Sequence, residues 1–227
     1  MISEEAVTKK MYGISEVISM KIGIMGGTFD PIHNGHLHLA RTALTQFDLD
    51  QIWFMPNGMP PHKKQSSIES DIHERIAMTR IAIKANKQFY LQEYEAKREK
   101  VSYSYKTMEH FRKMYPDDEF YFIIGADSLF SIETWKHPER LFKACIILAA
   151  CRDEAATKES LNGQIQMLKG KYGAYIKFLA MPLEHVSSHE IRKLIESGEP
   201  VSEYIPAEVE AYIRKEGLYG SGNRKNQ

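Results

Sequence analysis

Two histidines that follow a pair of glycines are the residues of this chain best suited to chemistry. His33 and His36 lie three residues apart with Gly35 between them, so both rings can face one ligand. Gly26 and Gly27 would let backbone N–H groups approach a phosphate closely. A following helix would add the positive end of its dipole. This segment therefore predicts a site for the phosphates of a nucleotide.

The residues around this segment predict the elements that would position it. The apolar run Ile22–Met25 precedes it and predicts a buried strand. Residues 37–44 follow it and carry apolar side chains at helical spacing. The context is therefore strand, glycine-bearing loop and helix, with Asn34 as the expected helix N-cap.

Zinc is the alternative ligand for this segment, because His38 follows closely on His33 and His36. A structural zinc site needs further Cys, His or carboxylate ligands to complete a tetrahedron. The two cysteines, Cys145 and Cys151, are distant in sequence. On a helix His38 would also point away from His36, so the residues favour an anion site.

The rest of the chain alternates between strand and helix patterns. Strands are expected at Ile22–Met25, Ile52–Met55, Phe89–Leu91, Phe120–Ile124, Cys145–Ala149 and Tyr175–Leu179. Helices are expected to begin at Asp71, Ser104, residue 160, Ser187 and Pro206. The alternation predicts an α/β fold with a doubly wound, mainly parallel sheet. Ligands of such sheets bind beyond the carboxyl ends of the strands.

Length and charge limit the classes of function. One domain is expected over residues 21–218, with a helical or disordered extension at 1–20 and a disordered polar tail at 219–227. The 30 basic and 30 acidic residues leave no net charge to attract nucleic acid or a membrane. Two cysteines give no disulfide framework and suit a reducing cytoplasm. The oligomeric state stays open, a homo-oligomer included.

Polar groups follow several of the predicted strands. The loop 56–64 carries Lys63 near two prolines, a composition that also fits a solvated surface loop. Gly125 and Asp127 follow the fourth strand, and Trp135 lies further along.

The last predicted strand leads into two adjacent serines. Ser187 and Ser188 stand at a helix start, where hydroxyls and free N–H groups bind phosphate well. Arg192 follows one turn later and can reach the same anion.

These motifs together resemble a known family. The string Gly-Gly-Thr-Phe-Asp-Pro-Ile-His-x-Gly-His contains the Thr/His-x-Gly-His signature of the nucleotidyltransferase superfamily, and in full it resembles the nicotinate-nucleotide adenylyltransferases. The Pro-Pro-His-Lys loop, Gly-Ala-Asp-Ser with a later Trp, and Ser-Ser-x-x-Ile-Arg are similar to the same family in the same order. The resemblance runs from Lys21 to about Gly217 and implies a Rossmann-like nucleotidyltransferase fold.

The resemblance implies transfer of AMP from ATP to nicotinate mononucleotide, giving deamido-NAD and pyrophosphate. The attacking phosphate has a second pKa of about 6 and is already largely dianionic, so no general base is needed. The implied cofactor is Mg²⁺ held by the ATP phosphates, and no metal ligand is assigned among the side chains. The implied partners are these two small molecules only.

Family roles carry over to this chain residue by residue. The implied catalytic groups are His33, His36, Lys63 and Arg192. The implied ATP-binding residues are Gly26, Gly27, Thr28, Phe29, His33, His36, Gly125, Asp127, Ser187, Ser188 and Arg192. The implied mononucleotide-binding residues are Ser104, Trp135 and Asp127. Ser104 replaces the family's threonine and keeps a hydroxyl, whereas Lys106 and His189 replace an aspartate and a threonine.

Two other functions remain open from the residues. A phosphopantetheine adenylyltransferase or another adenylyl- or cytidylyltransferase would share the histidine motif. A sensor that binds adenine nucleotides without catalysis would keep the same pocket, and the departures at Ser104, Lys106 and His189 leave room for it.

Overall fold

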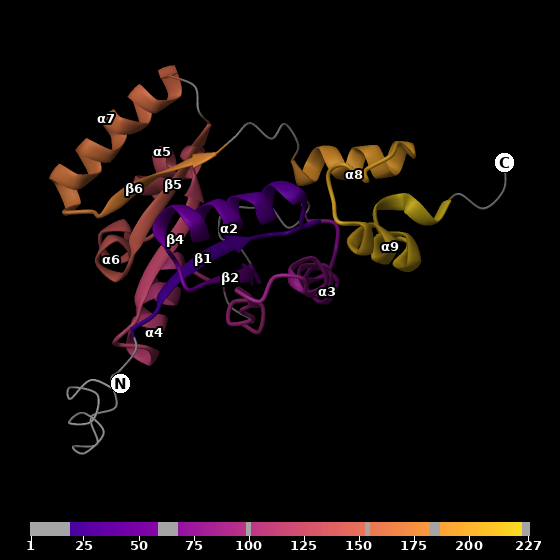
Figure 1. Cartoon of the computed structure of the whole chain (residues 1–227), viewed down its shortest axis with the longest axis horizontal. Coiled ribbons are helices and arrows are strands. Elements are labelled where there is room, and N and C mark those ends of the chain that lie inside the picture. The colour runs from indigo at the N-terminus through magenta and orange to yellow at the C-terminus, as the bar shows by residue number, and fades with distance from the viewer. Residues whose placement is uncertain (1–18, 59–67, 99–100, 153–154, 182–186, 224–227) are drawn as a thin grey trace, which may run out of the picture.

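A parallel sheet of six strands in the order β3-β2-β1-β4-β5-β6 is the centre of the protein (Figure 1). The computed structural model describes residues 19–58, 68–98, 101–152, 155–181 and 187–223. The strands are β1 (Lys21–Gly27), β2 (Gln51–Pro56), β3 (Phe89–Leu91), β4 (Glu119–Gly125), β5 (Ile146–Arg152) and β6 (Ile176–Met181). The α/β prediction and all the expected strands are confirmed.

Two strands begin one residue later than expected. Cys145 precedes β5 because it still caps the helix before it, where its N–H donates to the carbonyl of Leu141. Tyr175 precedes β6 and gives only its carbonyl to the ladder, as the acceptor for the N–H of Ile147.

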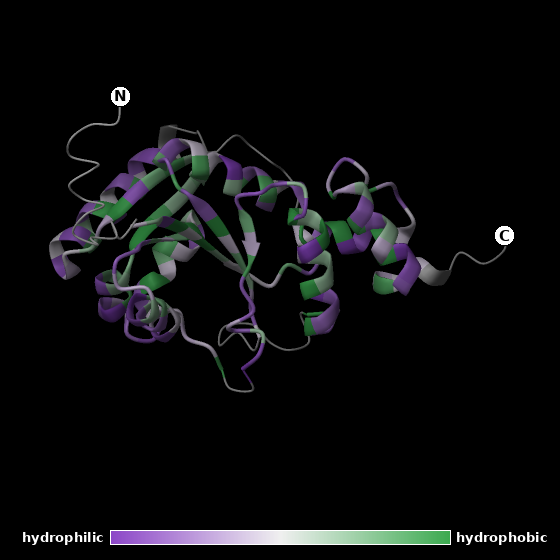
Figure 2. Cartoon of the chain, turned by 60° about the horizontal axis from the view of Figure 1, so that its bottom comes forward, coloured by the Kyte–Doolittle hydropathy of each residue, from purple (hydrophilic) through white to green (hydrophobic). Residues whose placement is uncertain are grey.

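Helices cover both faces of the sheet. They are α2 (Asn34–Phe47), α3 (Ile72–Ile83), α4 (Ser104–Met114), α5 (Ala126–Ser131), α6 (Pro138–Ala144), α7 (Ala155–Tyr172), α8 (Ser188–Ser197) and α9 (Ala207–Glu216), with 3₁₀ turns η2 (Ile132–Thr134) and η3 (Leu218–Asn223). One core lies under α2, α3, α8 and α9, and the other under α4 to α7. Figure 2 shows hydrophobic and hydrophilic bands alternating along the helices, as amphipathic helices on a sheet require.

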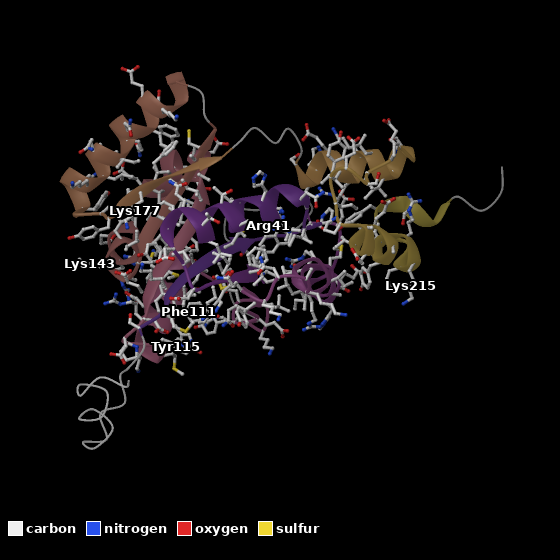
Figure 3. The ribbon with its side chains drawn as sticks, in the orientation of Figure 1. Arg41, Phe111, Tyr115, Lys143, Lys177 and Lys215 are labelled. Carbon is white, nitrogen blue, oxygen red and sulfur yellow. The ribbon has the colours of Figure 1, made fainter. Side chains whose placement is uncertain are left out.

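Continuous apolar runs form the central strands because both faces of the sheet are covered. Ile24 in β1 lies between Trp53 of β2 and Phe122 of β4, and all three are buried. Trp53 also packs edge-on against Phe111 of α4 and against Tyr115 just after it. Phe111 and Tyr115 are labelled beside α4 in Figure 3. These aromatic contacts fix α4 against the sheet.

The order of the strands defines where a ligand can bind. β1 pairs with β2 on one side and with β4 on the other, all in parallel. The chain therefore leaves β1 and β4 toward opposite edges of the sheet, which opens a crevice beyond their carboxyl ends. Gly26 and Gly27, which end β1, lie at this point, and His33 and His36 follow them.

Two of the expected helix caps are wrong by one residue. The N-cap of α2 is His33, because Asn34 is already helical and its side chain and N–H donate to the carbonyls of Glu203 and Tyr204. The N-cap of α4 is Tyr103, which is extended, so Ser104 is the first helical residue and does not cap.

Three helix ends lie where the sequence predicts them, and two other helix boundaries differ from the prediction. Asp71 caps α3 through a reciprocal bond with Glu74, and Gly198 and Gly217 close α8 and α9 in the left-handed conformation. The helix expected at 160–169 runs from Ala155 to Tyr172. Pro206 precedes α9 as its N-cap, because its ψ of 142° is not helical.

The tail is ordered further than expected. Residues 218–223 form η3, and the side chain of Tyr219 is buried, so disorder from residue 219 is not observed within the described part. The extension at 1–20 lies outside the described residues as far as residue 18. Among the described helices, none has the length and apolar character needed to cross a bilayer.

Candidate active site

A buried arginine holds the loop after β1 in place. Arg75 of α3 donates from one guanidinium nitrogen to the carbonyls of Thr28 and Asn57, at 2.8 and 2.9 Å. These carbonyls follow β1 and β2, so one side chain fixes both strand ends. Burial lowers the pKa of Arg75, and the nearby charge of Asp30 opposes that shift.

His33 and His36 lie ring against ring at the start of α2. Their centroids are 3.7 Å apart with an angle of 32° between the planes. The Nδ1 atom of His36 accepts the backbone N–H of His33 at 3.3 Å. This bond leaves Nε2 of a neutral His36 as the N–H donor.

His33 is the more buried of the two residues, with 8% of its surface exposed. Burial lowers its pKa to about 4, so the ring is neutral near pH 7. Its Nδ1 atom is buried without a hydrogen-bond partner among the described residues. Both predicted histidines therefore lie together, and the charge of His33 is not what would attract an anion.

Gly27 has a packing role that the sequence analysis did not foresee. A Cβ atom at this position would lie 2.7 Å from the ring of Phe29, which is buried and meets the ring of His36 edge-on. Phe29 was expected to bind ATP, but its ring is 1% exposed and supports His36 instead. Gly26 has no such close contact.

A pocket of about 440 Å³ opens beyond the carboxyl ends of β1 and β4. Gly26, Gly27 and Thr28 form its floor with Gly125, and His36 lies at its side. The start of α4 supplies the opposite wall. The volume lies within the range of small-molecule sites in proteins.

One part of the pocket lining is aromatic. Trp135 lies there with Tyr103, Tyr105 and Lys136. An indole can stack on an electron-poor ring, and tyrosine hydroxyls can bind polar substituents. The arrangement suits a flat heterocycle that carries a phosphorylated sugar pointing toward His36.

Comparisons with known proteins agree with this geometry. Residues 24–194 match the family described as cytidylyltransferase-like. Proteins named probable nicotinate-nucleotide adenylyltransferase from Clostridium kluyveri and Carboxydothermus hydrogenoformans are 40% and 44% identical, each over 88% of this chain and 99% and 98% of their own. The chain belongs to the nicotinate-nucleotide adenylyltransferase family.

Solved structures support the same fold. A Plasmodium falciparum nicotinic acid mononucleotide adenylyltransferase complexed with NaAD superposes with a TM-score of 0.70. It is 21% identical in sequence, and the match covers 88% of this chain and 98% of that one. At 21% identity this structural likeness establishes the fold alone.

The pocket gathers part of the predicted set of site residues. Those that line it are Gly26, Gly27, Thr28, His36, Ser104, Gly125 and Trp135. Asp127 is exposed in the first turn of α5 and does not line the pocket, although its neighbour Ser128 does. Lys63 lies outside the described residues.

The α8 residues that were expected to bind phosphate contact other parts of the protein in this structure. Ser187 caps α8 in a reciprocal bond with Glu190, and Ser188 donates to the carbonyl of Pro31 at 2.9 Å. Arg192 donates to Glu69 at 2.7 Å and to the carbonyl of Asp30 at 2.8 Å. In this adenylyltransferase, α8 therefore positions the loop after β1.

Asp30 is the centre of a buried network that the sequence did not reveal. Its carboxylate accepts the hydroxyl of Tyr219 at 2.7 Å and the backbone N–H groups of Glu69 and Ser70. Burial raises the pKa of Tyr219 strongly, and the charge of Asp30 adds to that effect. Partners this distant along the chain leave no local signal.

The zinc alternative finds no support in this arrangement. Within the described ranges, no three His, Cys, Asp or Glu side chains come together as a set of metal ligands. Cys145 and Cys151 are buried and outside any disulfide, and burial raises the pKa of Cys145 above its usual range.

Proposed function

We propose that this protein transfers AMP from ATP to nicotinate mononucleotide and releases deamido-NAD and pyrophosphate. The observation that carries the proposal is the pair of stacked histidines beside a pocket with a partly aromatic lining. The histidines suit phosphates, and the aromatic part of the lining suits a pyridine ring. Relatives about 40% identical over most of the chain carry the name of this activity.

The nucleophile in this reaction is the phosphate of the acceptor. It is mostly dianionic at neutral pH, so the site needs to align it with the α-phosphorus of ATP and stabilise the charge that develops. His36 is placed for this role, because its Nδ1 is occupied and its Nε2–H can donate to a phosphate oxygen. Backbone N–H groups at the start of α2, the positive end of the helix dipole, add to the stabilisation of phosphate charge.

The triphosphate of ATP would lie on the α8 side of the loop. Ser187, Ser188 and Arg192 are proposed to hold it, as the sequence motif implies. Arg192 donates to Glu69 through Nε and to the carbonyl of Asp30 through Nη1. A guanidinium group has five N–H donors, so a phosphate can bind beside these partners or take the place of Glu69.

Magnesium is proposed to arrive with ATP. Mg²⁺ prefers phosphate and water oxygens and needs few protein ligands. The exposed carboxylate of Asp127, in the first turn of α5, is the described group that fits a water-mediated contact with such an ion. The two buried cysteines, which form no disulfide, also fit a reducing cytoplasm as the location of the enzyme.

A pyrophosphate-release assay with Mg-ATP tests the proposal. Nicotinate mononucleotide, nicotinamide mononucleotide and 4′-phosphopantetheine are supplied in parallel, and we expect release chiefly with the first. Release mainly with 4′-phosphopantetheine would instead identify another adenylyltransferase. ATP binding without release in any of the three reactions would identify a sensor.

A further inference from the structure

A buried carboxylate lies in the pocket wall that faces α4. Glu95, in the turn after β3, is 6% exposed and lines the pocket. Its Oε1 atom accepts the hydroxyl of Thr107 at 2.7 Å. Its Oε2 atom has no hydrogen-bond partner among the described residues. The wall therefore presents a carboxyl oxygen that can accept a hydrogen bond.

An unpaired hydroxyl belongs to the same wall. Ser102 is 8% exposed, lines the pocket, and has a buried Oγ atom without a partner in the described part of the chain. Buried polar atoms are nearly always paired, so such an atom calls for an explanation. Glu95 precedes residues 99–100 in the chain, and Ser102 follows them. Both residues line the pocket together with the start of α4.

We propose that Glu95 and Ser102 form the subsite for the ribose hydroxyl groups of the acceptor mononucleotide. The proposal rests on the proposed function. Nicotinate mononucleotide has three parts, a pyridine carboxylate, a ribose and a phosphate. Only the ribose carries hydrogen-bond donors, and a carboxylate such as Glu95 repels the two anionic parts.

The pocket lining includes residues assigned to ATP, such as Gly27 and Gly125, beside residues assigned to the mononucleotide. The pocket lining contains Trp135 and the start of α4 but no residue of α8, whose serines and arginine are proposed to hold the triphosphate. Glu95 shares this lining with Trp135 and Ser104, the residues implied for the mononucleotide. With the pyridine ring against Trp135, the proposal places the ribose hydroxyl groups against Glu95 and Ser102.

Opposing effects act on the pKa of Glu95, and the net direction is upward. Burial raises its pKa, whereas the bond from Thr107 and the charge of Arg98 act in the opposite direction. A hydrogen bond from a ribose hydroxyl to Oε2 would favour the charged form of Glu95.

Steady-state kinetics of Glu95→Gln and Ser102→Ala test the subsite. The acceptors are nicotinate mononucleotide and its 2′-deoxy and 3′-deoxy analogues, and each KM is measured at saturating Mg-ATP. We expect Glu95→Gln to raise KM for the ribose acceptor roughly 10-fold or more and to leave KM for ATP unchanged. For one deoxy analogue the wild type should show a similar loss, and the variant should add little to it.

Glu93→Gln is the matched control. Glu93 belongs to the same turn but pairs at the surface with Arg80 and Lys97 and does not line the pocket. Its KM values should equal those of the wild type. Ser102→Ala removes a hydroxyl that has no partner, so it should fold normally and raise the acceptor KM alone, which keeps the test valid if Glu95→Gln is unstable.

Three results would overturn the subsite in an active enzyme. Equal losses for ribose and deoxy acceptors on Glu95→Gln would mean that Glu95 only holds Thr107 and α4. A changed ratio of nicotinate to nicotinamide mononucleotide turnover would place Glu95 against the pyridine substituent. Unchanged acceptor KM in both variants would remove any contact. A wild type inactive with nicotinate mononucleotide would refute the proposed function itself.

Discussion

Acidification should lower the free energy of unfolding, because buried His33 stays neutral in the folded protein and takes up a proton when the chain unfolds. The folded-state pKa of His33 is about 4, against 6.5 for an exposed histidine. Between these values the unfolded chain binds a proton that the folded chain does not, so stability is full above pH 6.5 and is lost as the pH falls toward 4. At pH 5 the loss relative to pH 7 is about 2 kcal/mol, at about 1.4 kcal/mol for each pH unit below the unfolded pKa.

Urea unfolding at pH 7 and pH 5 measures this loss. Other groups titrate over the same range, so the quantity compared is the change in unfolding free energy with pH for the wild type and for His33→Gln. The wild type should lose about 2 kcal/mol more than the variant. His38→Gln, on the same helix, is the control and should keep the wild-type dependence on pH. Equal pH dependence in all three proteins would refute the burial of a neutral His33.

Three further substitutions address the site and its support. His36→Ala should fold, retain acceptor binding and lose about 3 kcal/mol of transition-state stabilisation; near-normal turnover in the pyrophosphate assay would contradict its role. Lys63→Ala should raise KM for ATP more than KM for the acceptor, because the charge that it offsets belongs to the triphosphate; equal increases would argue against a phosphate contact. Tyr219→Phe should lower the unfolding free energy by about 1–2 kcal/mol in urea titrations, because it leaves a buried acceptor on Asp30 with one donor fewer; an unchanged midpoint would show that the bond is not needed.

The fold follows from the sequence because its signals are local. A strand covered on both faces is a continuous apolar run, such as residues 120–124, and these runs locate the ends of β1 to β6 within three residues. The histidine motif was found for the same reason, since its spacing is contained in one loop. Caps depend on more than spacing. Asn34 fails as a cap because it binds carbonyls of residues 203 and 204, which its neighbours in sequence do not reveal.

The parts of the site that the sequence missed are set by distant contacts. Glu95 lies in a stretch of charged residues that is typical of a solvated turn, and it becomes buried because Thr107 of α4 packs on it. Arg192 was predicted to bind a phosphate, and the structure adds two partners within the protein, Asp30 and Glu69, which two other loops supply. A single chain without spatial information cannot distinguish a free cation from one already paired.

The C-terminal segment belongs to the active site even though it lines no part of the pocket. Tyr219 in η3 donates to Asp30, the residue that follows Phe29, and Phe29 supports the ring of His36. A displacement of η3 would therefore reach His36 through Asp30 and Phe29 by direct contact. Catalysis by alignment tolerates little displacement of the donor, so the order of η3 is a requirement of the proposed mechanism.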